Sequence, residues 1–261
     1  MKGMRFLSMF LCAALLLTLL PVTALAADGT ISAGGTYDLL TYGSGSTITI
    51  DTTERVTLRG DGPVLMNVKI NCVAAGVDLT LVNVSINNTT PNACPLSFTG
   101  PGNTLTLAGS NMLRGGEYEP GVKVVDGVEL TIDGAGLLTA NGSYSDYGAA
   151  GIGGGYGKSG GSITINGGVI TAKGGFRSAG IGGGHSGTGG SITINGGTVT
   201  ATGGNSPSNS NDGGAGIGSG HFGFGGSVTI NGGTVTAQGG YNGAGIGGGG
   251  GRSGDIGGSV T

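Results

Sequence analysis

Aromatic and histidine side chains recur at fixed places in this chain. Three of them follow successive copies of the phrase Ala-Gly-Ile-Gly, and others follow a Gly-Gly pair later in the same repeat. The candidate binding residues defined by this spacing are Tyr156, His185, His221, Phe224, Phe176 and Tyr241. Rings held at exposed corners beside bare glycine backbone could stack on flat apolar bodies such as the C–H faces of sugars. They could equally be corner-filling side chains that shield the fold.

Metal chemistry has little support in the same residues. His185 and His221 are aligned and could share a metal ion, but the sequence offers no third ligand beside them. We therefore expect no metal site.

Catalytic chemistry is also poorly supported. Glycosidases need two carboxylates that face each other across the bond, and the repeats contain almost none. Asp126, Glu129 and Asp133 lie near one another with Lys123 close by, so they could form a site or simply be solvated strand-edge charges. No nucleophile-elbow, zincin or P-loop motif is present. The sequence therefore predicts a protein without catalytic activity.

The N-terminal 26 residues predict export. Lys2 and Arg5 precede an apolar run from Phe6 to Leu20, and Ala24-Leu25-Ala26 fits a signal-peptide cleavage site. We expect a secreted or cell-surface protein with no membrane span after signal removal. The chain carries 11 Lys+Arg against 14 Asp+Glu, without a basic run, so nucleic acid is not an expected partner.

Two of the three cysteines, Cys72 and Cys94, lie outside the predicted signal peptide. They are 22 residues apart, which is about one turn of the repeat described next. Stacked positions on adjacent turns lie roughly 4.8 Å apart, within reach of a disulfide. A disulfide and a pair of buried thiols are both open at this point.

Glycine is the positional marker of the fold. The phrase Gly-Gly-Ser-Ile-Thr-Ile-Asn-Gly-Gly begins at Gly160 and returns with small changes at 189, 225 and 257. Self-similarity at intervals of 29, 36 and 32 residues is typical of a solenoid. The strands are too short, and the glycines too frequent, to leave room for helices.

Each repeat divides into three short strands and three corners. In Ser162–Asn166 the two isoleucines alternate with polar residues, so Ile163 and Ile165 should point inward. The next strand buries Ile170 and Ala172, and the third buries Ile152. Equivalent residues should stack in columns, including an asparagine column of Asn166, Asn195 and Asn231 that hydrogen-bonds from turn to turn.

The sequence therefore predicts an all-β fold, a single-stranded parallel β-helix with three short strands per turn. By analogy with parallel crossovers it should be right-handed. The predicted divisions are a signal peptide (1–26), N-terminal capping strands (27–60), irregular turns (61–147) and regular Gly-rich repeats (148–261). The last repeat ends within a strand at Thr261, and we expect no C-terminal cap in this chain, as in a truncated solenoid.

The phrases Ser-Ile-Thr-Ile-Asn-Gly-Gly-Thr-Val-Thr-Ala and Gly-Ala-Gly-Ile-Gly-Gly-Gly resemble secreted bacterial β-helix proteins of the carbohydrate-binding or adhesin-like type. They are similar to the β-helical polysaccharide-binding family of cellulolytic clostridia, well over 120–261 and loosely over 60–120. The resemblance implies a right-handed β-helix that binds acidic or cellulosic polysaccharide, often with calcium. That family commonly has Gly-Asp-Gly-Ile where this chain has Ala-Gly-Ile, so calcium is implied by resemblance only and no ligand is carried over.

Three functions follow as hypotheses. The first is a polysaccharide-binding or adhesin-like β-helix whose partner is a polysaccharide or cell-surface glycan. The alternatives are a β-helical polysaccharide lyase or glycoside hydrolase, and a structural stalk of a larger surface protein.

Overall fold

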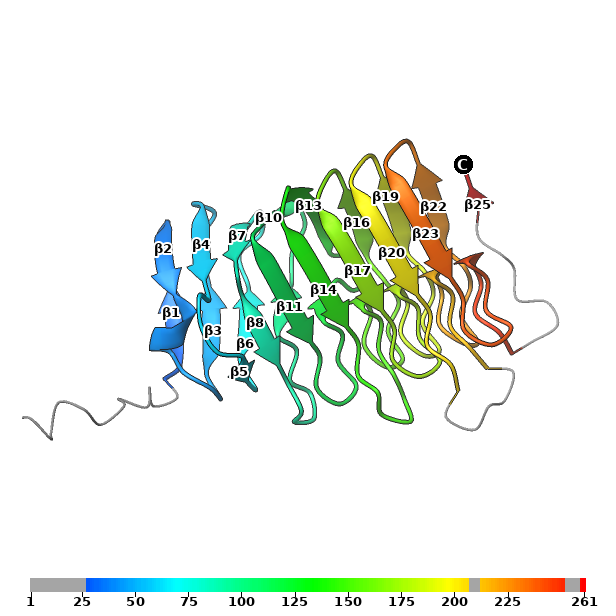
Figure 1. Ribbon diagram of the computed structural model, residues 1–261, viewed down its shortest axis with the longest axis horizontal. Helices are drawn as coiled ribbons and strands as arrows, with labels where there is room; N and C mark the ends of the chain where they lie inside the picture. Colours follow the sequence, from blue (N-terminus) through cyan, green and yellow to red (C-terminus); the bar gives the residue numbers. More distant parts are fainter. Residues whose placement is uncertain (1–26, 207–211, 252–258) are drawn as a thin grey trace, which may run out of the picture.

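The computed structural model describes residues 27–206, 212–251 and 259–261, so the predicted signal peptide lies outside the described residues. The chain coils into an elongated prism with three parallel sheets as its faces (Figure 1). In Figure 1 the strands of the near sheet run downward and those of the far sheet run upward as the chain advances to the right. The coil is therefore right-handed, as predicted.

The three sheets take one strand each from most turns of the chain. Sheet A contains β1 (Gly29–Ile31), β3 (Thr47–Ile50), β6 (Lys69–Cys72), β9 (Leu96–Phe98), β12 (Val122–Lys123), β15 (Ile152–Gly153), β18 (Ile181–Gly182), β21 (Ile217–Gly218) and β24 (Ile246–Gly247). Sheet B contains β2 (Gly35–Asp38), β4 (Val56–Arg59), β7 (Asp78–Val82), β10 (Asn103–Ala108), β13 (Glu129–Gly134), β16 (Ser162–Ile165), β19 (Ser191–Ile194), β22 (Ser227–Ile230) and β25 (Ser259–Val260). Sheet C contains β5 (Leu65–Met66), β8 (Ser85–Asn87), β11 (Ser110–Arg114), β14 (Leu137–Asn141), β17 (Val169–Lys173), β20 (Thr198–Thr202) and β23 (Thr234–Gln238).

We number the turns from the N-terminus, each beginning at its sheet A strand. Turn 1 contains β1 and β2, and the short 3-10 helix η1 (Leu39–Thr41) follows them where later turns have a sheet C strand. Turns 2 to 8 each have three strands, as predicted. Residues 27–60, expected as capping strands, thus supply the first strands of sheets A and B. None of the helical structure in the described part of the chain is long and apolar enough to cross a membrane.

The interior consists of the predicted columns of branched side chains. Ile152 pairs with Ile181 and Ile181 with Ile217, and all three are fully buried. Ile163 and Ile192 stack in the same way on sheet B. Burying each such side chain contributes about 1.5–3 kcal/mol. These columns hold a glycine-rich chain together.

The corner between sheets B and C carries the predicted asparagine ladder. Asn195 Nδ2 donates to Asn166 Oδ1 at 2.9 Å, and Asn231 Nδ2 donates to Asn195 Oδ1 at 2.8 Å. Gly168 turns this corner with φ 86°, a conformation that glycine adopts without strain. The ladder thus joins turns 6, 7 and 8 along one edge.

The two cysteines form no disulfide: Cys72 and Cys94 are both buried free thiols. Cys72 pairs with Phe98 in the next turn, so Cys94 lies four residues short of the stacked position. The turn is longer here than the 22 residues that separate the cysteines. Burial raises the pKa of both thiols, that of Cys94 to about 12 with help from the nearby Glu119 carboxylate. The prediction of a possible disulfide was wrong, and the buried-thiol alternative holds.

Candidate functional site

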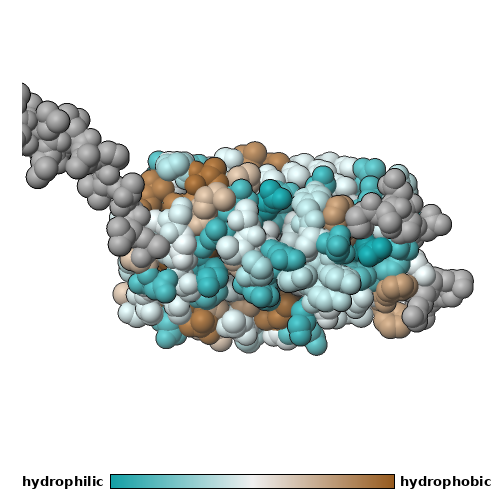
Figure 2. All heavy atoms as spheres, turned by 90° about the horizontal axis from the view of Figure 1, so that it is seen from below, coloured by the Kyte–Doolittle hydropathy of each residue, from teal (hydrophilic) through white to brown (hydrophobic). Residues whose placement is uncertain are grey.

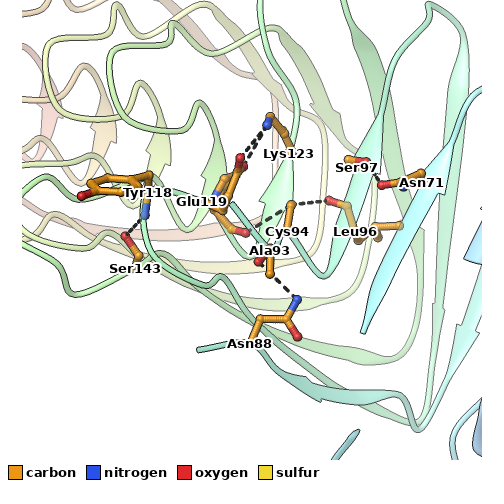
Figure 3. Close-up of polar contacts among 11 residues, drawn as sticks. Asn71, Asn88, Ala93, Cys94, Leu96, Ser97, Tyr118, Glu119, Lys123 and Ser143 are labelled. Atoms are coloured by element: carbon orange, nitrogen blue, oxygen red, sulfur yellow. Dashed lines mark hydrogen bonds and ion pairs between the residues drawn. The ribbon is translucent and has the colours of Figure 1, made fainter. Parts of the chain in front are cut away.

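A groove runs along the outer side of sheet A in turns 3 to 6. Two adjoining hollows of about 490 and 440 Å³ form it, and they share Asn92, Glu119 and Lys123. Its floor is a column of outward side chains, since Asn71 pairs with Ser97 and Ser97 with Lys123 in register. Ser97 Oγ donates to Asn71 Oδ1 at 2.9 Å (Figure 3). The floor is therefore polar and ordered.

An ion pair lies in the middle of the groove. Lys123 Nζ is 2.9 Å from each carboxylate oxygen of Glu119 (Figure 3). The Glu119 side chain is only 11% exposed, whereas that of Lys123 is 30% exposed. The loop before β12 fixes Glu119 through its backbone, because Glu119 N donates to Gly116 O and Ser143 N donates to Glu119 O. The pair presents charged hydrogen-bonding groups to anything that enters the groove.

Three tyrosines gather at the C-terminal end of the groove. The ring centroids of Tyr147 and Tyr156 are 4.8 Å apart, and those of Tyr118 and Tyr156 are 6.0 Å apart. All three line the second hollow, and Tyr147 and Tyr156 are 45% and 42% exposed. Of the six ring residues predicted as a binding set, Tyr156 is the one that lines this groove. It is joined there by two tyrosines that the sequence pattern did not single out.

The two histidines continue the ring stack away from the groove. His185 stacks on Tyr156 at 5.6 Å between centroids, and His221 stacks on His185 at 5.6 Å, as the alignment predicted. They are only 7% and 2% exposed, so they are not the open platform that we expected. Each ring is covered by its neighbours in adjacent turns, and burial lowers the pKa of His185 to about 4 with help from His221 and Arg177. Their arrangement supports a packing role.

The other predicted residues lie apart from the groove. Phe224 is 60% exposed on the loop after β21. Phe176 packs edge-on against Tyr144, whose ring also lies 5.3 Å from Lys173 Nζ. Tyr241 is exposed two turns further on, where its backbone N–H donates to Asn205 Oδ1. Figure 2 shows separate apolar spots on one face of the prism, with no continuous apolar patch.

The acids that could have formed a site are divided between two faces. Asp126 lines the groove, but Glu129 and Asp133 lie on β13 in sheet B. Lys123 pairs with Glu119, not with these acids. Within the described residues no three His, Cys, Asp or Glu side chains gather to hold a metal. The buried Ala150, Ala179 and Ala215 occupy the Ala-Gly-Ile positions, so the calcium implied by the resemblance does not fit these residues.

The sequence did contain a signal for the groove floor. Asn71, Ser97 and Lys123 are spaced 26 residues apart, the length of a turn in this part of the chain. Lys69, Tyr118 and Tyr147 could not be found in this way, because the first stands alone and the tyrosines lie in loops of different lengths.

The repeats match a protein-family model described as beta helix repeat, over residues 130–156, 163–185, 192–221 and 228–250. No curated protein and no solved structure matches the chain. The matched segments begin after Lys123, so most of the groove lies outside them. Sheets, register and family model agree: the chain is a parallel β-helix protein with beta helix repeats.

Proposed function

We propose that this protein is a polysaccharide-binding β-helix without catalytic activity, and that its site is the groove over sheet A. One observation carries the proposal: a polar groove floor leads into three contacting, partly exposed tyrosines. Sugars have hydroxyls around the ring edge and apolar C–H faces, and protein sites for them combine hydrogen-bonding groups with aromatic rings. The groove supplies both along one line.

The N-terminal sequence supports a place for this activity outside the cell. A secreted or surface-attached protein meets polysaccharide or cell-surface glycan as its natural partner. N-terminal sequencing of the mature protein tests export, with Ala27 expected as its first residue.

Binding is tested with a glycan array and a pull-down on insoluble polysaccharides. Tyr156→Ala removes a ring from the groove and should weaken binding about tenfold, the value of one stacked ring. Tyr241→Ala is the matched control, since it removes an equally exposed tyrosine remote from the groove. Absence of binding to every glycan, or equal loss in both variants, would contradict the proposal.

A hydrolase or lyase is the second candidate, because Glu119 and Asp126 line the same groove. The bound polysaccharide should be assayed for new reducing ends and for unsaturated products. Release of either, abolished by Glu119→Gln, would favour an enzyme. Intact polysaccharide after long incubation would favour binding alone.

A further inference from the structure

The outward column on sheet A changes character at turn 6. In turns 3 to 5 it carries Asn71, Ser97 and Lys123. Lys123 pairs with Gly153 in turn 6, and Gly153 pairs with Gly182 in turn 7. A side chain at Gly153 is excluded, since an added Cβ would lie 2.0 Å from the Gly182 carbonyl oxygen. The groove floor therefore has side chains only as far as turn 5.

The loops on the two sides of sheet A also meet from turn 6 onward. Tyr156 N, in the loop after sheet A, donates to Tyr118 O in a loop before sheet A at 3.0 Å. The same kind of bond recurs from His221 N to Arg177 O at 2.8 Å. In turns 3 to 5 the loops bond instead to loops of their own kind, for example Asn92 N to Glu117 O. The groove is thus closed beyond turn 6.

The opposite end has no such closure. The column continues from Asn71 to Thr49 on β3, which pairs with it in turn 2 and is partly exposed. A ligand in the groove can leave toward the N-terminal turns, but it meets the paired loops and the tyrosine rings at the other end. An interior segment of a polysaccharide would have to leave the groove at both ends.

We infer that the groove recognises the end of a glycan chain, an inference that rests on the proposed function. The terminal sugar lies against the tyrosines, and the following sugars pass over Lys123, Ser97 and Asn71. These three positions are one turn apart, about 4.8 Å each, which is similar to the advance of one sugar in an extended chain. A terminal sugar also has one hydroxyl more than a linked one, and the Glu119–Lys123 pair lies where that hydroxyl can be bound.

The test compares intact and partly cleaved polysaccharide as soluble competitors at equal mass. Xylan, barley β-glucan and polygalacturonate are each used before and after limited endo-cleavage that raises the number of chain ends tenfold. For the glycan that binds, the mass giving half-maximal competition should fall about tenfold after cleavage. Equal competition before and after cleavage would overturn chain-end recognition while leaving polysaccharide binding intact. Absence of competition by all samples, together with a negative array, would overturn the proposed function itself.

A pair of variants locates the chain along the groove. Asn71→Ala should weaken binding of a tetrasaccharide several-fold but leave a disaccharide unaffected, because a disaccharide at the tyrosine end does not reach turn 3. Tyr156→Ala should weaken both. Thr193→Ala, on the outer face of sheet B, is the control for both. Equal effects of Asn71→Ala on the two ligands would overturn this placement.

Discussion

Turns 3 to 5 and turns 6 to 8 share an interior and differ outside it. Ile70 in turn 3 and Ile181 in turn 7 occupy the same column, and both are fully buried. On the outer side the first group, which we call the open turns, carries Asn71, Ser97 and Lys123. The second group, the closed turns, has glycine at those positions and loops that bond across the sheet. A β-helix can thus keep one core and gain or lose a groove by changing a single outward column.

The shared interior makes the strongest prediction. Ile70→Ala and Ile181→Ala remove the same atoms from the same column, one in the open turns and one in the closed turns. Each should lower the free energy of unfolding by about 2–5 kcal/mol. Urea denaturation followed by circular dichroism measures both. Costs that differ by more than about twofold would show that the two interiors are not equivalent.

The difference outside predicts unequal tolerance of a side chain. Gly182 has φ 127°, and a Cβ there would lie 2.0 Å from the Gly218 carbonyl oxygen. Gly182→Ala should therefore cost about 2–4 kcal/mol through backbone strain and overpacking. Ser97→Ala, at the same column position in the open turns, should change stability by less than about 0.5 kcal/mol. Similar unfolding midpoints for the two variants would refute the distinction.

Acid should act on the closed turns first, since both histidines of the chain lie there. Burial, His221 and Arg177 hold the pKa of His185 at about 4, below the ordinary 6.5, and Asp212 opposes them only in part. The unfolded chain then binds a proton between pH 6.5 and 4 that the folded chain does not, so stability should fall by about 2 kcal/mol across this window.

Hydrogen exchange at pH 7, 5.5 and 4 locates the effect. Protection should decrease in turns 6 to 8 before it does in turns 3 to 5, and His185→Gln should reduce the pH dependence. Uniform loss of protection along the chain would argue against a local cause.

The smallest expected effect concerns the asparagine ladder of the closed turns. Asn195→Ala removes two exposed side-chain hydrogen bonds, to Asn166 and from Asn231, at a cost of about 0.5–1 kcal/mol. Thr106→Ala, on the outer face of sheet B in turn 4, serves as the control and should cost less. A thermal melt resolves the two, and an equal change in both would deny the ladder a structural role.

The closed turns were largely predictable from the sequence, whereas the open groove was not. Strict repetition reveals register, so Ile163, Ile165 and Asn166 could be assigned to core and corner before the structure was known. His185 and His221 were aligned correctly but expected to be exposed, because a repeat does not show whether the loops on either side of a strand will meet. Glu119 and Lys123 come together only through the path of one irregular loop. A pattern within one turn cannot describe contacts that depend on the shape of that loop.

The turn is also a unit of length. Because each turn packs only on its two neighbours, a closed turn can be copied or lost without altering the groove. Each such event would move the groove relative to the C-terminal turns by about 4.8 Å. The glycine column that closes sheet A therefore turns the second half of the chain into an adjustable spacer, whose length can evolve independently of what the first half binds.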